Sequence, residues 1–177
     1  NNVAATLIEQ IDNLSTIASQ FSNFASMPEI KFQNIDIVEV TGKCVELFNS
    51  NDDYSISFDT SSDKLFLKSD REQLSRALIN IIKNAIQSIP SDRKGKIVVV
   101  LREIADQVEI SVADNGCGIP DDIKPKIFVP NFTTKSGGMG LGLAISKNIT
   151  EQLNGTINFT TKAGEGTIFK LQFPLPG

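Results

Sequence analysis

The sequence predicts an α+β fold, a two-layer sandwich in which about three helices cover a mixed, mostly antiparallel sheet. After residue 36, about six strand-like and three substantial helix-like segments follow one another, with hairpins rather than regular strand–helix–strand repeats. The chain has 177 residues, of which 40% are hydrophobic, so it can bury one sizeable core. One long heptad-patterned helix precedes this core. We therefore divide the chain into a helical segment at 1–28 and a domain at 29–177.

The composition indicates the cellular setting of the protein and excludes some classes of partner. The net charge is −4, and lysine and arginine form no cluster, which argues against a nucleic-acid partner. The spacing of Cys44 and Cys117 fits neither a disulfide framework nor a metal site, which favours a reducing, cytoplasmic setting. The longest apolar run, 97–101, is far too short for a membrane helix, so we expect no membrane contact within these residues, although a full-length protein could be anchored elsewhere. Histidine is absent, so no imidazole is available here for catalysis or metal binding.

The first segment has the pattern of one amphipathic helix, which Pro28 ends. Its apolar positions alternate in spacings of four and three: Leu7, Ile11, Leu14, Ala18, Phe21 and Ala25. Such a stripe needs a partner helix, from this chain, from an upstream part or from a second copy. An ordinary helix that folds back on the domain is the alternative.

The segments up to residue 89 predict a connector, a helix, a hairpin and a second helix. We expect an extended connector over 29–36, a short helix that reaches Phe48, a hairpin of 54–59 with 65–67, and a helix over 71–89. Asp70 precedes that helix as an N-cap. One arc of the helix is apolar, and the other side carries a polar stripe: Gln73, Arg76, Asn80, Lys83, Asn84 and Gln87. Asn80 and Asn84 lie one turn apart, so their amides project together.

The second half predicts four strands and one further helix. Strands over 96–103 and 107–113 lead to Asp114, and strands over 156–161 and 167–173 flank a glycine turn. Between these pairs we expect a short helical turn at 121–128, a loop at 129–138 and a helix over 140–153 that Asn154-Gly155 ends.

Two glycine-rich motifs lie close together in the sequence, separated by a short connecting segment. They read Asp114-Asn115-Gly116-Cys117-Gly118-Ile119 and Gly138-Met139-Gly140-Leu141-Gly142. Glycine lets a ligand approach the bare backbone, and amides at a helix start bind anions, so we interpret the stretch as a nucleotide pocket. It is no dinucleotide fingerprint, because loop residues precede the second motif, and the chain has no Walker A sequence.

Three further motifs raise the specificity of this interpretation. Asn80-xxx-Asn84-Ala85 comes before the glycine-rich motifs, Phe128-xxx-Phe132 lies between them, and Gly164-x-Gly166-Thr167 follows. In this order the motifs resemble the catalytic ATP-binding domain of two-component sensor histidine kinases, part of a superfamily with gyrase, mismatch-repair and heat-shock-chaperone ATPases. The resemblance covers residues 30–177. Residues 1–28 resemble the second helix of the dimerisation and phosphoacceptor hairpin of such kinases.

The resemblance implies an activity, two ligands and two partners. ATP and Mg²⁺ would bind, and the γ-phosphoryl group would pass to a histidine outside these residues, for relay to a response-regulator aspartate. The partners would be the receiver domain of a response regulator and a second protomer bound through the helical hairpin.

For the base of ATP, the resemblance implies roles for five residues. Asp114 would accept a hydrogen bond from the exocyclic amine of adenine, which selects adenine over guanine. Gly116 and Gly118 would let the backbone pass beneath the base, Ile119 would offer it an apolar surface, and Thr167 would face it through the hydroxyl. An ordinary capping role for Asp114 and a plain strand position for Thr167 are the alternatives.

For the phosphates, the resemblance implies that Asn84 is an oxygen ligand of Mg²⁺, and that Asn80 supports the ion or a phosphate. Lys83 and Lys135 would contact phosphates by charge, although a solvated lysine is an equally simple interpretation. The start of the last helix would bind phosphate oxygens through Gly138, Gly140, Leu141 and Gly142, under a lid at 129–137.

Asn80 separates this chain from the ATPase branches of the superfamily. There a glutamate stands one helical turn before the magnesium asparagine and acts as general base, a role that an amide cannot fill, so hydrolysis should be poor. We therefore interpret Asn80 and Lys83 as catalytic through positioning and charge. Two alternatives stay open: an anti-sigma-factor-type serine kinase, which lacks a preceding heptad helix, and a module that only binds nucleotide.

Overall fold

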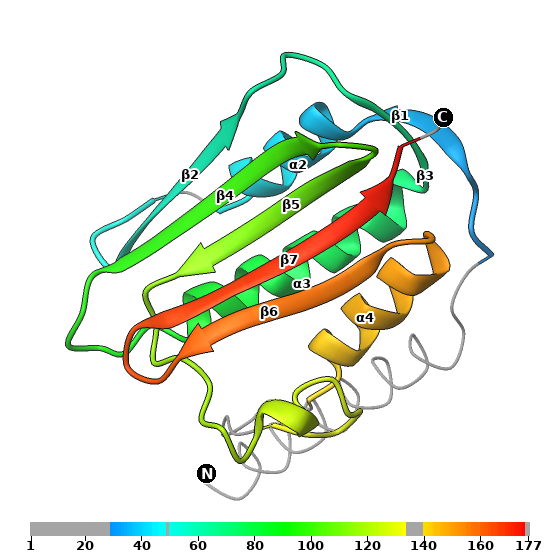
Figure 1. The fold of residues 1–177 in the computed structure, drawn as a ribbon. Coiled ribbons are helices and arrows are strands. Elements are labelled where there is room, and N and C mark those ends of the chain that lie inside the picture. Colours follow the sequence, from blue (N-terminus) through cyan, green and yellow to red (C-terminus); the bar gives the residue numbers. More distant parts are fainter. Residues whose placement is uncertain (1–28, 49, 134–139, 176–177) are drawn as a thin grey trace, which may run out of the picture.

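The structure is a computed structural model that describes residues 29–48, 50–133 and 140–175 (Figure 1). The predicted helix at 1–28, part of the predicted lid, and the candidate residues Lys135 and Gly138 lie outside the described residues.

The main sheet has five strands in the order β2-β4-β5-β7-β6. Its strands are β2 (Tyr54–Thr60), β4 (Gly95–Ile104), β5 (Gln107–Asp114), β6 (Thr156–Lys162) and β7 (Gly166–Pro174). Strands β2 and β4 are parallel, and the other neighbours are antiparallel. A separate two-stranded sheet pairs β1 (Gln33–Asp36) with β3 (Phe66–Ser69). The predicted mixed, mostly antiparallel sheet is confirmed.

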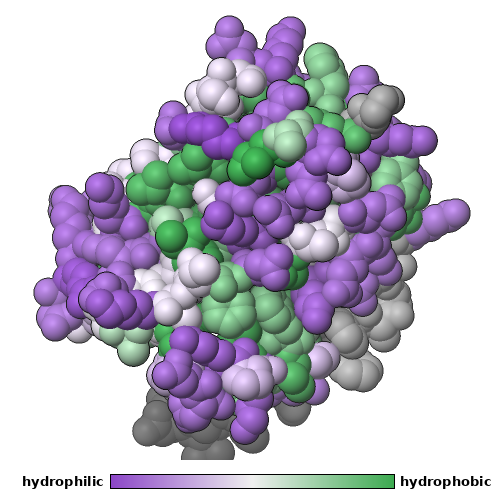
Figure 2. Space-filling model, in the orientation of Figure 1, coloured by the Kyte–Doolittle hydropathy of each residue, from purple (hydrophilic) through white to green (hydrophobic). Residues whose placement is uncertain are grey.

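Among the described residues, three α-helices lie on one face of the main sheet (Figure 1). They are α2 (Ile37–Glu46), α3 (Arg71–Gln87) and α4 (Gly142–Gln152), and a short 3₁₀-helix, η1, spans Lys124–Lys126. The core lies between the two layers, where alternate residues of β4 and the apolar arc of α3 are buried: Ile97, Val99, Leu101, Leu78, Ile81 and Ile82. On the opposite face of the sheet, hydrophobic side chains lie among hydrophilic ones (Figure 2). The predicted two-layer α+β sandwich is confirmed.

The predicted hairpin of 54–59 with 65–67 is wrong. Strand β2 instead pairs in parallel with β4, with Ile56 opposite Ile97, and β3 pairs with β1, the segment predicted as a connector. The backbone of Leu65 bonds to the amide of Ile37 at 2.8 Å, which holds β3 beside the start of α2. Alternation of polar and apolar residues reports which face of a strand is buried, not which strand lies beside it. The residues between β2 and β3 also contain no glycine, which tight hairpin turns favour.

Helix α3 begins as predicted. The Asp70 carboxylate accepts hydrogen bonds from the amides of Glu72 at 3.0 Å and Gln73 at 3.1 Å, which satisfies two donors of the first turn. The helix ends at Gln87, and Ser88 is its C-cap. Because α3 crosses beneath the sheet between α2 and α4, its polar stripe is carried to the start of α4 (Figure 1).

Candidate functional site

A cleft of about 590 Å³ lies between α3, the turn after β5 and the start of α4. Among the described residues, its polar and glycine lining is Asn80, Lys83, Asn84, Gln87, Ser88, Asp114, Cys117, Gly118, Thr133, Gly140, Gly142 and Thr167. Its apolar lining is Ile119, Pro120, Ile123, Ile127, Phe132, Leu141, Leu143 and Phe169. A concave site that combines apolar side chains with convergent polar groups is the usual form of a small-molecule site.

Helix α3 forms one wall of the cleft. Asn80, Asn84 and Ser88 follow one another at intervals of four residues, so they share one face of the helix. The Asn80 side-chain amide donates to the carbonyl of Gly142 at 3.5 Å. A Cβ atom on Gly142 would lie 3.9 Å from Asn84 Nδ2 and 4.0 Å from Asn80 Cγ. The start of α4 is therefore next to both asparagines, as the sequence predicted.

The end of β5 forms the opposite side, where Asp114 is partly buried. Its Oδ1 accepts from the Ser88 hydroxyl at 3.0 Å, the Gly116 amide at 2.8 Å and the Thr167 amide at 3.2 Å. Thr167 lies opposite Asp114 in the β5–β7 register. We call Ser88, Asp114, Gly116 and Thr167 the cleft floor. Donors from three separate elements fix the position of this carboxylate.

Gly116 supports the floor from behind and does not line the cleft. A Cβ atom there would overlap the Ser88 side chain, 2.7 Å from both its Cβ and its carbonyl oxygen. The close approach of the turn to the end of α3 therefore requires glycine. Gly118, by contrast, lines the cleft directly.

The start of α4 contributes the backbone of Gly140 and Gly142 to the cleft, beside Leu141 and Leu143. Gly140 has φ = +65°, and a Cβ atom there would overlap the backbone of Phe132, 2.6 Å from its nitrogen. Leu141, the N-cap residue of α4, is buried and makes no side-chain capping bond. The amides of this first helical turn are oriented toward the N-terminal end of α4, where an anion is favoured.

Thr167 belongs to a hydroxyl network beside the floor. Its Oγ1 lies 2.9 Å from Thr161 Oγ1, which in turn accepts from the Ile119 amide at 2.9 Å. This network connects β6 and β7 to the glycine-rich turn, so Thr167 contributes both its amide and its hydroxyl to the site.

Arg93 holds the glycine-rich turn from outside the cleft. Its Nη1 donates to the carbonyls of Asn115 at 2.7 Å, Gly164 at 3.0 Å and Gly116 at 3.3 Å. The Gly164 amide also donates to the Cys117 carbonyl at 2.7 Å. One guanidinium therefore joins the turn after β5 to the turn between β6 and β7.

Most of the predicted site residues meet in this single cleft. Ten of them line it: Asn80, Lys83, Asn84, Asp114, Gly118, Ile119, Gly140, Leu141, Gly142 and Thr167. Sequence reasoning missed Ser88 and Arg93 as site residues. Ser88 has a signal, since it lies four residues after Asn84 on the same stripe. Arg93 has none, because its acceptors are carbonyl groups.

The described residues contain neither a metal-binding cluster nor a helix that could cross a membrane. Within the described ranges, no group of three or more cysteine, aspartate or glutamate residues could hold a metal ion by itself. No helix in that same part of the chain is long and apolar enough to cross a membrane.

Comparison with known proteins establishes the family. Residues 69–177 match the family described as "Histidine kinase-, DNA gyrase B-, and HSP90-like ATPase", and the chain belongs to this family. The predicted catalytic ATP-binding domain is thereby confirmed, and ATP is the nucleotide of the family. The sensor histidine kinase ZraS of Klebsiella oxytoca is 32% identical over 181 residues, which cover 100% of this chain and 39% of ZraS. The chain thus spans well under half the length of this relative.

Solved structures support the same family. The catalytic domain of histidine kinase ThkA is 31% identical, with a TM-score of 0.72 over 81% of this chain and 95% of that one. ThkA in complex with response regulator protein TrrA gives a TM-score of 0.76 at 26% identity, over 97% of this chain and 50% of that one. Full-length ShkA in complex with AMPPNP gives a TM-score of 0.83 at 25% identity, over 98% of this chain and 38% of that one.

Proposed function

We propose that this chain is the catalytic part of a sensor histidine kinase that transfers the γ-phosphoryl group of ATP·Mg²⁺ to a histidine outside these residues. One observation carries the proposal: Asp114, the two asparagines of α3 and the start of α4 line one cleft. The similarity to ZraS, ThkA and ShkA supports the kinase class. A response regulator as the next acceptor is supported by the complex of ThkA with TrrA. The predicted second protomer stays part of the proposal.

The base of ATP would bind at the cleft floor. Asp114 is held through Oδ1 by three donors, and a carboxylate has further lone pairs that can accept from the 6-amino group of adenine. Guanine would present a carbonyl oxygen there, and two acceptors cannot pair. Ile119 and Gly118 would lie against the base. This arrangement selects ATP over GTP.

The phosphates would bind between α3 and α4. The carboxamide of Asn84 suits Mg²⁺, a hard ion that takes oxygen ligands, and Asn80 is close enough to support it. With no acidic cluster in the described ranges, phosphate and water oxygens would complete the coordination. Bound magnesium would neutralise charge on the transferring phosphoryl group. Lys83 and the amides of Gly140 to Gly142 would add positive potential, and the predicted contacts of Lys135 and Gly138 belong to the same proposal.

Asn80 favours transfer over hydrolysis. An amide side chain cannot take a proton from water, whereas a neutral imidazole nitrogen attacks phosphorus through its own lone pair. A bond from that nitrogen to the γ-phosphorus would form as the bond to the β–γ bridging oxygen breaks, and ADP would leave. The residues of this chain need only position ATP and balance its charge.

The base assignment is tested by Asp114→Asn. The new side-chain amide can take two orientations. In one, its oxygen accepts from Ser88, Gly116 and Thr167, and its NH₂ group faces the amine of adenine, so two donors meet. In the other, the NH₂ group faces those protein donors instead. We expect the Kd for ATP to rise about 100-fold, measured by isothermal titration calorimetry. Asp63→Asn, an exposed aspartate outside the cleft lining, is the matched control and should bind like the wild type. Normal ATP binding by Asp114→Asn would overturn the assignment.

The metal assignment is tested by Asn84→Ala. We expect this variant to lose more affinity for ATP in the presence of Mg²⁺ than in EDTA, by about tenfold, because only the metal-bound state uses the carboxamide oxygen. An equal loss in both conditions would show that Asn84 acts on the nucleotide or the fold rather than on the metal.

Kinase activity is tested with the full-length protein and ATP labelled at the γ-phosphate. We expect a phosphoenzyme that is labile in acid and stable in alkali, as phosphohistidine is. The 177-residue chain alone should bind ATP without becoming labelled, since it has no histidine. Acid-stable label in the full-length protein would favour a serine kinase, and ATP binding with no label would favour a module that only binds nucleotide.

A further inference from the structure

Ser88 joins the wall of the cleft to its floor. It caps the C-terminus of α3, its hydroxyl lies 3.0 Å from Asp114 Oδ1, and its carbonyl accepts from the Cys117 amide at 3.0 Å. The side chain and the backbone of one residue thus bind the turn after β5 on both sides of Gly116. Gly116 itself leaves no space between the turn and Ser88. The position of the turn relative to α3 is therefore set at this residue.

The single hydroxyl hydrogen of Ser88 has two acceptors within reach. Its Oγ lies 2.7 Å from the Ala85 carbonyl and 3.0 Å from Asp114 Oδ1. The Ala85 carbonyl already accepts from the Ser88 amide at 3.2 Å, whereas the carboxylate is the more strongly accepting group. We therefore assign the hydroxyl hydrogen of Ser88 to a charge-assisted bond that it donates to the Asp114 carboxylate.

This bond differs from the other two that reach Asp114 Oδ1. The Gly116 amide belongs to the same turn as Asp114, and the Thr167 amide belongs to the paired strand β7. Ser88 is the donor from α3, the helix that also carries Asn80 and Asn84. The terminal torsion of an aspartate is broad, so a third donor from another direction restricts the rotation of the carboxylate.

We propose that Ser88 is a specificity-determining residue, which orients the Asp114 carboxylate toward the 6-amino group of the purine and fixes its distance from the phosphate-binding asparagines. The inference rests on the proposed function of Asp114. Ser88 touches the carboxylate rather than the reacting atoms, so it acts as a positioning residue. Its effect should appear only for nucleotides that carry the amine.

The experiment is a double-mutant cycle in which one change is made in the protein and the other in the nucleotide. Wild type and Ser88→Ala are each titrated with ATP and with purine riboside triphosphate, which lacks the 6-amino group. We expect the Kd for ATP to rise about tenfold in the variant and the Kd for the analogue to stay within about twofold. Ser91→Ala, an exposed serine outside the cleft lining, is the matched control and should leave both values unchanged.

Each other outcome overturns the inference. An equal loss for both nucleotides would mean that Ser88 holds the fold rather than the carboxylate, and no loss for either would mean that the bond has no role in binding. Asp114→Asn in the same cycle separates this inference from the proposed function. If Asp114→Asn loses the preference for the amine and Ser88→Ala keeps it, only the role of Ser88 fails. If Asp114→Asn also keeps it, the base assignment itself fails.

Discussion

Two aspartates of this molecule accept several hydrogen bonds from the protein, yet they serve different ends. Asp70 is 7% exposed and bonds to the amides of Glu72 and Gln73 through Oδ1 and of Lys31 through Oδ2, at 2.8 to 3.1 Å. Asp114 accepts from Ser88, Gly116 and Thr167 on Oδ1 and lines the cleft. The donors to Asp70 are all backbone amides, whereas those to Asp114 include the Ser88 hydroxyl beside the amides of Gly116 and Thr167. A further difference is that both oxygens of Asp70 bond to the backbone, whereas Asp114 borders a ligand-sized space.

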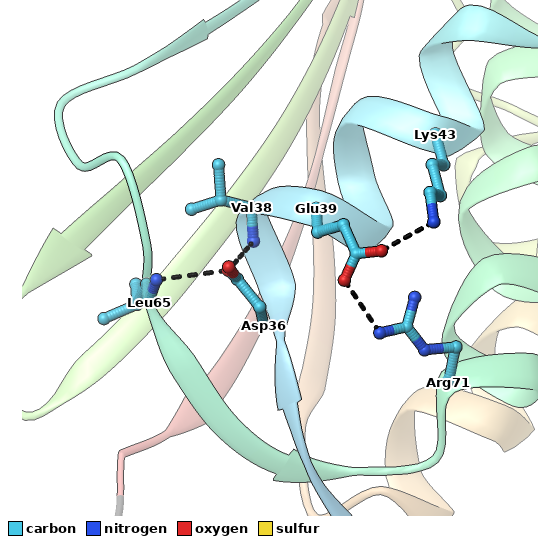
Figure 3. Close-up of polar contacts among 6 residues, drawn as sticks. All are labelled: Asp36, Val38, Glu39, Lys43, Leu65 and Arg71. Carbon is cyan, nitrogen blue, oxygen red and sulfur yellow. Dashed lines mark hydrogen bonds and ion pairs between the residues drawn. The ribbon is translucent and has the colours of Figure 1, made fainter.

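Asp70 and the polar residues around it do not line the cleft. Figure 3 shows the neighbouring contacts, where Asp36 Oδ1 accepts from the amides of Val38 at 3.1 Å and Leu65 at 3.3 Å. Glu39 bonds to Lys43 at 2.6 Å and to Arg71 at 3.0 Å. We call Asp36, Glu39, Lys43, Asp70 and Arg71 the capping corner. Substitutions there should change stability without changing nucleotide affinity, and substitutions in the cleft floor should change affinity.

The largest effect is expected at Gly116, a residue of the cleft floor that also contributes to the stability of the fold. Gly116→Ala would force the turn away from Ser88, so we expect the free energy of unfolding to fall by about 1–3 kcal/mol. For a chain of this size that corresponds to roughly 2–4 °C in Tm per kcal/mol, measured by calorimetry or circular dichroism. ATP affinity should fall as well, because Asp114 moves with the turn.

Gly142→Ala is the matched control for Gly116→Ala. The added Cβ atom would make ordinary contacts at 3.9 and 4.0 Å with the two asparagines, at the first residue of α4. Alanine is the better helix former by about 1 kcal/mol in a helix interior, so stability should be unchanged or slightly higher. Equal destabilisation by the two substitutions would contradict the close packing that we describe at Gly116.

Asp70→Ala tests the other side of the comparison. The loss of the N-cap of α3 should lower the free energy of unfolding by about 1–2 kcal/mol, since the amides of Glu72, Gln73 and Lys31 lose their acceptor. The Kd for ATP, measured below the unfolding transition, should stay unchanged. A tenfold weaker affinity in a folded variant would show that the capping corner is coupled to the cleft.

These two regions also mark what the sequence could and could not predict. The Asp70 cap and the asparagine stripe of α3 were predicted correctly because both depend on residues within a few positions along one helix. The lining of the cleft followed from the resemblance of the motifs. The partner of β3 was predicted wrongly, and Ser88 and Arg93 were missed. The spacing of α3 places Ser88 on the face of Asn84, but it does not report the bond from Ser88 to Asp114, 26 positions away. The bonds of Arg93 span 22 to 71 positions, and no local pattern reports them.

Arg93→Ala should loosen the cleft floor from outside. The guanidinium bonds to three carbonyls of two turns but is exposed, so we expect a loss of about 1 kcal/mol in stability. Amide hydrogen exchange at Gly164, whose amide bonds to the Cys117 carbonyl, should become faster. Lys94→Ala removes an exposed positive charge from the same loop and is the control. If both variants exchange alike, the effect comes from charge and not from the carbonyl contacts.

The smallest effect is expected for Glu39→Gln in the capping corner. Hydrogen bonds from Arg71 and Lys43 lower the pKa of Glu39 from 4.5 to about 2. A carboxyl group whose pKa is lower in the folded state stabilises the fold above its unfolded pKa, and this contribution disappears as the pH falls through the folded value. Wild-type Tm should therefore fall slightly more than the Tm of Glu39→Gln between pH 4.5 and about 2. Glu39 is exposed, so about 1 M salt should remove the difference. A difference that survives high salt would mean that the ion pairs of this corner contribute more to the fold than their exposure allows.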